Sequence, residues 1–125
     1  MEIETLLNTG AVTYAQAARF TLEAANVLAT QNGEEAFNYA AERNWLPRNA
    51  SPNDPARLDG IALLLMRSFE INGGIMYSLF GSARYAYREL MYLNVIQRRA
   101  DPAMQVSGER LLFYVNRIYA QRESE

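Results

Sequence analysis

The sequence predicts an all-α protein built from repeated helix-loop-helix units, and three observations support this prediction. Apolar residues recur at helical spacing in five segments, whereas no alternation typical of a β-strand persists. Asn, Gly and Pro separate these segments into short helices and loops. A pattern of residues also returns after 50 positions, and such a fixed period indicates a repeated supersecondary unit.

The repeat is clearest between Asn44–Asp59 and Asn94–Glu109. An alignment without gaps from Glu34/Arg84 to Phe69/Tyr119 has six identities in 36 pairs, against roughly two expected by chance. The identical pairs are Ala36/Ala86, Asn44/Asn94, Arg48/Arg98, Ala50/Ala100, Pro52/Pro102 and Arg67/Arg117. We therefore divide a single domain of 125 residues into units at approximately 1–31, 34–72 and 82–121, with the first unit a reduced copy.

The first elements follow from helix-start and helix-stop residues. Glu2 to Asn8 fits a short helix, and Thr13 with Gln16 forms a capping-box pattern that begins a helix reaching about Ala29. Asn32 then caps a helix over Glu34–Arg43. Asn44 ends that helix, because Asn tolerates the left-handed conformation at a helix C-terminus, and Asn94 is expected to do the same in the next unit.

The second half of the repeat supplies the predicted central helix. Asp54 caps it and Pro55 occupies its first turn, so that the helix covers about Ala56–Glu70. The run Ile61 to Met66 is apolar nearly all round, which is typical of a helix buried on several sides. Asp59 and its counterpart Glu109 lie early in their helices, where a carboxylate favours the helix dipole.

The last elements are predicted in the same way. A short apolar segment from Ile75 to Phe80 follows the central helix. Ser82 caps a helix over Ala83–Leu93, and Ser107 caps one over Gly108–Ala120, beyond which a polar tail from Gln121 should fray. The residues expected to be buried are Leu64, Leu65, Phe69, Leu90, Ile96, Leu112 and Val115.

Composition narrows the classes of function. The chain has no Cys, no His and no Lys, which removes thiol chemistry, the usual general base near neutral pH, and Schiff-base chemistry. Catalysis, metal sites and cofactors are therefore not expected. Twelve Arg against fourteen acidic residues give a net charge of −2, without the basic excess that nucleic acid binding needs. The longest apolar run is far too short for a transmembrane segment.

These units resemble the S-layer homology module of bacterial envelope proteins. In that family a helix ends in a short apolar pair, a loop follows, and a Thr-Arg-Ala-Glu-like tetrapeptide opens the second helix. Two copies look like this pattern and a third looks like a reduced form of it: Tyr39–Leu46 with Ala56–Asp59, Ala86–Ile96 with Asp101-Pro102 and Val106–Glu109, and Thr13–Gln16. The resemblance covers most of the chain.

The resemblance implies a three-lobed helical domain that holds a protein to cell-wall glycopolymer. In the family, the Arg of the tetrapeptide lies in the ligand grooves. Arg57 is the match in this sequence, whereas Tyr14 and Ser107 stand at that position in the other two copies.

Arg57 is therefore the leading candidate for a binding residue. Its planar fork of donors matches anionic sugar substituents, phosphate or a partner's carboxylate, although a bridge to an acid on a neighbouring unit is an equal alternative. We expect it in a groove where the loop and helix start of one unit meet the next unit's helix. Tyr85, Arg88 and Tyr92 are second choices. Core packing or a contact between subunits is the favoured explanation of the tyrosines over sugar stacking, which leaves a homo-oligomer open.

The leading functional interpretation is a non-catalytic binding or structural module of the bacterial cell envelope, periplasmic or wall-associated. Its partner would be cell-wall glycopolymer or another envelope protein. No secretion signal is visible at Met1, and the alternative is a cytoplasmic α-helical adaptor or regulatory protein-interaction domain. An enzyme that uses only carboxylates is the third interpretation.

Overall fold

The computed structural model describes residues 3–72, 82–97 and 99–123. Within these ranges the chain forms helices and no strand, which confirms the all-α prediction. The helices are α1 (Ile3–Leu7), α2 (Tyr14–Ala24), α3 (Gly33–Glu42), α4 (Leu58–Ser68), α6 (Ala83–Tyr92) and α7 (Gly108–Glu123). The predicted segment from Ile75 to Phe80 lies outside the described residues.

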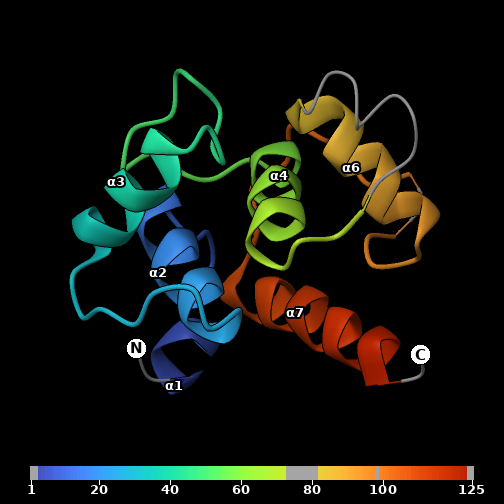
Figure 1. The fold of residues 1–125 in the computed structure, drawn as a ribbon, viewed down its shortest axis with the longest axis horizontal. Coiled ribbons are helices and arrows are strands. Elements are labelled where there is room, and N and C mark those ends of the chain that lie inside the picture. Colours follow the sequence, from blue (N-terminus) through green and yellow to red (C-terminus); the bar gives the residue numbers. More distant parts are fainter. Residues whose placement is uncertain (1–2, 73–81, 98, 124–125) are drawn as a thin grey trace.

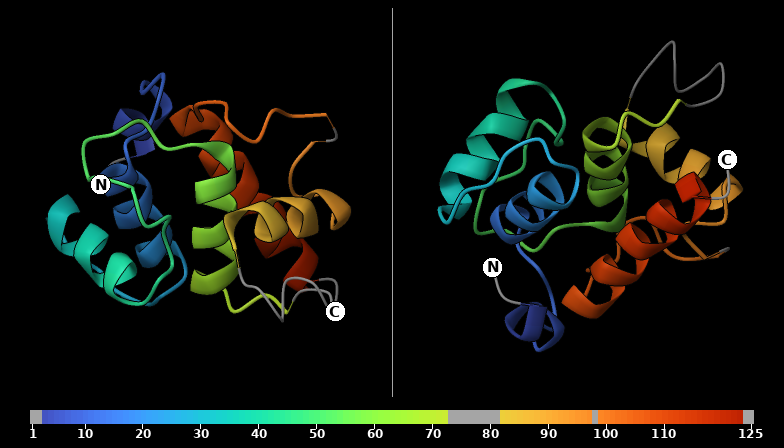
Figure 2. Two further views of the ribbon diagram at one scale, coloured as in Figure 1. Left: turned by 90° about the horizontal axis from the view of Figure 1, so that it is seen from above. Right: turned by 60° about the horizontal axis from the view of Figure 1, so that its bottom comes forward.

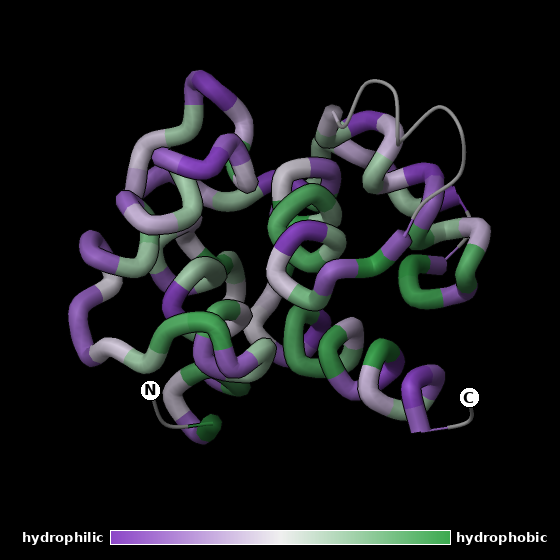
Figure 3. The backbone as a smooth tube through the Cα atoms, in the orientation of Figure 1, coloured by the Kyte–Doolittle hydropathy of each residue, from purple (hydrophilic) through white to green (hydrophobic). Residues whose placement is uncertain are grey.

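Helix α4 occupies the centre of the fold (Figure 1). It packs against α2 on one side and α6 on the other, while α3 covers α2, and α7 contacts α1 and α2. Figure 2 shows the same arrangement from two further directions. Nine of the 11 residues of α4 are buried, and its tube is mostly apolar in colour (Figure 3). The prediction of a central helix around Ile61–Met66 is therefore confirmed.

The described helices share one hydrophobic core. Six of the residues predicted to be buried are buried: Leu64, Leu65, Phe69, Leu90, Ile96 and Val115. Leu112 is instead only partly buried. The side of α7 that faces the hydrophobic core carries Leu111, Tyr114, Val115 and Ile118. No helix in the described part of the chain is long and apolar enough to cross a membrane.

Four helices end in the same backbone motif. Asn26, Asn44, Glu70 and Asn94 each have a positive φ of 52° to 64° directly after the helix C-cap. Each of these residues, and the one after it, donates its amide proton back to a carbonyl in the last helical turn, the Schellman arrangement. The predicted roles of Asn44 and Asn94 are confirmed.

The same motif corrects the predicted end of α2. That helix stops at Ala24 rather than at Ala29, because Asn26 turns the chain and the amides of Val27 and Leu28 both donate to the carbonyl of Leu22. The predicted fraying after Ala120 is also wrong within the described residues. Helix α7 continues to Glu123, and the Gln121 side chain donates to the carbonyl of Leu93 at 2.6 Å.

Helix starts follow the predicted caps in four cases, one of which is Asn32, whose side chain accepts the amide protons of Glu34 and Glu35. Thr13 and Gln16 form a complete capping box, and the hydroxyls of Ser82 and Ser107 accept amide protons in the first turns of α6 and α7. Helix α4 departs from the prediction, because it begins at Leu58 and not at Asp54–Pro55. Asp54 does not cap it; its carboxylate accepts the amide proton of Ser51 and closes a turn in the preceding loop.

Hydrogen bonds recur at the spacing of 50 residues that the sequence shows. The amide of Trp45 donates to Ala40 as that of Val95 donates to Leu90, and the loops repeat the pattern with Ala50 to Pro47 and Ala100 to Gln97. Superposition of the two complete units, with Asn44 on Asn94 and Asp59 on Glu109, stays a prediction.

Candidate binding groove

Three extended segments meet where α2, α4 and α7 begin. The amide of Ala56 donates to the carbonyl of Val12, and the amide of Val12 donates to the carbonyl of Val106, each at 2.8 Å. All three side chains are fully buried. Because this junction holds the residues just before α4 in extended conformation, the helix begins only at Leu58, and Arg57 becomes its N-cap without a side-chain capping bond.

In two of these helices, the first backbone amides donate hydrogen bonds to carbonyl groups of a loop. The amides of Tyr14 and Ala15 in α2 donate to Asp54 and Pro52, at 3.1 and 3.0 Å. The same relation recurs for α4, where the amides of Leu58 and Asp59 donate to Met104 and Pro102, at 2.9 and 3.0 Å. Each loop is thereby attached to the start of another unit's helix, and this attachment shapes the space between them.

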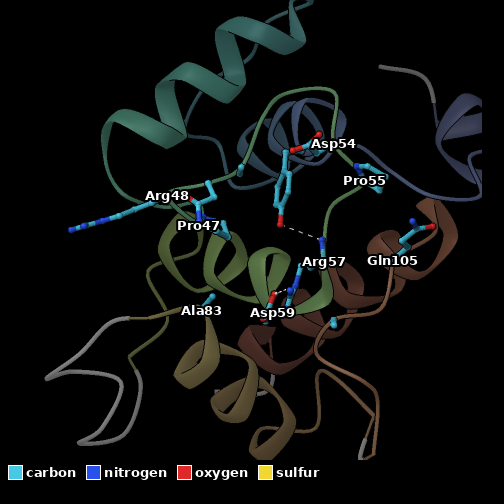
Figure 4. Close-up of a pocket in the computed structure, with 12 residues that line it drawn as sticks. Pro47, Arg48, Asp54, Pro55, Arg57, Asp59, Ala83 and Gln105 are labelled. Carbon is cyan, nitrogen blue, oxygen red and sulfur yellow. Dashed lines mark hydrogen bonds and ion pairs between the residues drawn. The ribbon is translucent and has the colours of Figure 1, made fainter.

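A groove of about 530 Å³ opens at this junction. It lies between the loop that precedes α4, the start of α4, the first residue of α6 and the loop that precedes α7 (Figure 4). Its lining residues are Tyr14, Pro47, Arg48, Asn49, Ala50, Asp54, Pro55, Arg57, Asp59, Ala83, Ala103 and Gln105. A groove is thus present at the predicted junction of one unit's loop and helix start with the next unit; its use in binding stays a prediction.

Arg57 forms a two-pronged ion pair inside this groove. Its Nε donates to Oδ1 of Asp59 at 3.3 Å, and its Nη2 donates to Oδ2 at 3.0 Å. The Arg57 side chain is 54% exposed and that of Asp59 17%, so the carboxylate is the more enclosed partner. The expectation that Arg57 bridges to an acid on a neighbouring unit is wrong, because Arg57 pairs with Asp59 at the start of its own helix.

Tyr14 lines the groove beside Arg57, and Gly60 lies close to the Tyr14 ring and hydroxyl. The Tyr14 hydroxyl accepts the amide proton of Arg57 at 3.3 Å, and burial, together with the nearby Asp59 carboxylate, raises the pKa of Tyr14. A Cβ atom on Gly60 would lie 2.7 Å from the Tyr14 hydroxyl. Sequence reasoning missed both roles; the one available signal was a glycine within an otherwise apolar helical run.

The other predicted site residues lie elsewhere. Tyr85, Arg88 and Tyr92 belong to α6 but do not line the groove, which α6 reaches only through Ala83. Tyr92 is 82% exposed, so core packing does not explain it. Glu109 is exposed in the first turn of α7. Within the described residues, no group of three or more acidic side chains is arranged to hold a metal ion.

Comparisons with protein-family models, with curated proteins and with solved structures find no match to this chain.

Proposed function

We propose that the chain is a non-catalytic binding module of the bacterial cell envelope that attaches to cell-wall polymer through the groove around Arg57. The observation that carries the proposal is the place of this groove. It opens where the loop and helix start of one unit meet the next unit, and it contains the arginine that the S-layer homology resemblance assigns to ligand contact.

The size and chemistry of the groove support a binding role. Its volume falls within the range of roughly 300–1,000 Å³ usual for ligand sites. Small apolar side chains lie beside a few polar ones, the combination that binds a ligand's apolar faces and orients its polar groups. Another envelope protein is the competing partner for the same surface, and the experiment below separates the two.

The test is sedimentation of the purified protein with purified bacterial cell wall. Arg57→Ala should weaken binding about tenfold, the usual loss for a hydrogen bond to a charged group. Arg88→Ala is the matched control, because Arg88 is an exposed arginine of α6 outside the groove. Thermal melting of both variants verifies that they are folded.

Equal binding by Arg57→Ala and the parent would remove the groove from the proposal. If neither protein sediments with cell wall while a pull-down returns a protein partner whose binding needs Arg57, a protein-interaction role replaces wall attachment.

A further inference from the structure

We infer that the groove around Arg57 takes an uncharged saccharide, rich in hydroxyl and amide groups, and discriminates against anionic polymers. The inference rests on the proposed function and names the ligand class of the same groove. An arginine without a partner would be expected to prefer a carboxylate or phosphate ligand, and this inference is the opposite.

The first observation is the balance of charge. Two arginines and two aspartates line the groove, so its formal charge sums to zero. Asp59 already occupies the Nε and Nη2 donors of Arg57 through both of its carboxylate oxygens. Arg48 extends away from Arg57 and the middle of the groove (Figure 4). An anion that approached Arg57 would therefore also meet the Asp59 carboxylate, and the two like charges would repel each other.

The second observation concerns the helix starts. Free amides at a helix N-terminus commonly bind anions, and both α2 and α4 begin beside this groove. Their first two amides, however, already donate to loop carbonyls: those of α2 to Asp54 and Pro52, and those of α4 to Met104 and Pro102. The amide of Arg57 is likewise used by the Tyr14 hydroxyl. These five backbone amides are therefore already in use and are not available to an anion.

The third observation is the kind of polar group that lines the groove. Asn49 and Gln105 are exposed and carry both donors and acceptors, while Asp54 is an exposed acceptor. The pairing with Asp59 leaves the Nη1 hydrogens of Arg57 without an acceptor among the residues that the structure describes. Sugar hydroxyls both donate and accept, so they match this mixture. The small apolar side chains of Ala50, Ala83 and Ala103 suit the C–H faces of a sugar ring.

The experiment compares two soluble probes by titration calorimetry at about 50 and about 500 mM NaCl. The Debye length, over which electrostatic interactions act, is severalfold shorter at the higher salt concentration than at the lower one. One probe is an N-acetylglucosamine tetramer, which is uncharged, and the other is poly(glycerol phosphate). The parent chain should bind the tetramer with an affinity that salt changes less than about twofold, and should bind the phosphate polymer at least about tenfold more weakly.

Asp59→Asn supplies the decisive variant, because it removes the groove's competing carboxylate and leaves a net positive charge. It should strengthen binding to poly(glycerol phosphate) about three- to tenfold at the lower salt concentration, and salt should abolish the gain. Glu109→Gln is the matched control. It removes one negative charge at the corresponding position of α7, outside the groove, and should leave both probes unaffected.

Stronger, salt-sensitive binding of poly(glycerol phosphate) by the parent would overturn the inference and leave wall attachment standing. The inference would also fail if whole cell wall binds in an Arg57-dependent way but the tetramer does not. Failure to bind whole wall would contradict the proposed function together with the inference.

Discussion

Among the four glycines that the structure describes, Gly108 leaves the least room for a Cβ atom, and replacing it tests how the N-terminal segment is held. A Cβ atom at Gly108 would lie 1.7 Å from the carbonyl oxygen of Leu6 and 2.6 Å from its carbonyl carbon. Real Cβ atoms essentially never approach other atoms within 3.0 Å, so Gly108→Ala must move α1 away from α7 by more than about 1 Å.

The largest expected loss in the free energy of unfolding is that of displacing α1 completely from α7. Leu6 is fully buried, and burying a leucine side chain contributes about 1.5–3 kcal/mol. The hydrogen bond from the Gly108 amide to Thr9, at 2.9 Å, adds about 1 kcal/mol. Alanine favours the helix by up to about 1 kcal/mol over glycine. We therefore expect Gly108→Ala to lower the free energy of unfolding by about 2–4 kcal/mol.

Urea denaturation followed by circular dichroism measures this change. Gly10→Ala is the control, because a Cβ atom there meets nothing within 4 Å; it should leave stability equal or raise it by about 0.4–1 kcal/mol. If Gly108→Ala acts by displacing α1, Leu6→Ala should cost much less in the Gly108→Ala background than in the parent. A Gly108→Ala variant as stable as the parent would refute the close packing of α1 on α7.

Two further predictions concern stability. Glu70 occupies a left-handed position, with a φ of 52°, that Asn fills in the three equivalent motifs. Glu70→Gly should therefore raise the free energy of unfolding by about 1 kcal/mol, whereas Asn44→Gly should change it by only a few tenths; a loss in Glu70→Gly would contradict the assignment. Burial raises the pKa of Tyr14 above that of the unfolded chain, so the folded state keeps its proton to higher pH. Stability present below about pH 10 should thus be lost as pH rises through the folded pKa, and less steeply in Tyr14→Phe; equal slopes in denaturation from about pH 9 to 11 would contradict this.

Local residue type predicted those parts of the fold that local interactions decide. The asparagines at helix ends are an example, because the left-handed conformation depends mainly on the residue itself. The apolar run of α4 likewise sufficed to predict a buried helix. The start of α4 could not be predicted in this way. Residues 55–57 are held in extended conformation by hydrogen bonds to segments distant in sequence, and these override the preference of Asp54–Pro55 for beginning a helix.

The candidate site also has features that could be predicted from the sequence and features that could not. Arg57 was predicted in a groove at the unit junction because the S-layer homology resemblance implies that its arginine lies in a ligand groove, and a groove lies there. Its pairing with Asp59 was missed, since side-chain pairing two residues apart at an N-cap depends on the extended backbone of Arg57. Tyr85, Arg88 and Tyr92 were second choices from one helix face, and helical spacing does not say which neighbour a face meets.

Attachment to cell-wall polymer through the groove can be tested by a nuclear magnetic resonance titration of the ¹⁵N-labelled chain with solubilised cell-wall glycan. We expect the amide signals that shift to belong to the groove, around Asn49, Arg57, Ala83 and Gln105, and we expect Arg57→Ala to weaken the effect. Shifts gathered instead on the exposed face of α6 around Arg88 and Tyr92, or no shifts at saturating glycan, would contradict this expectation.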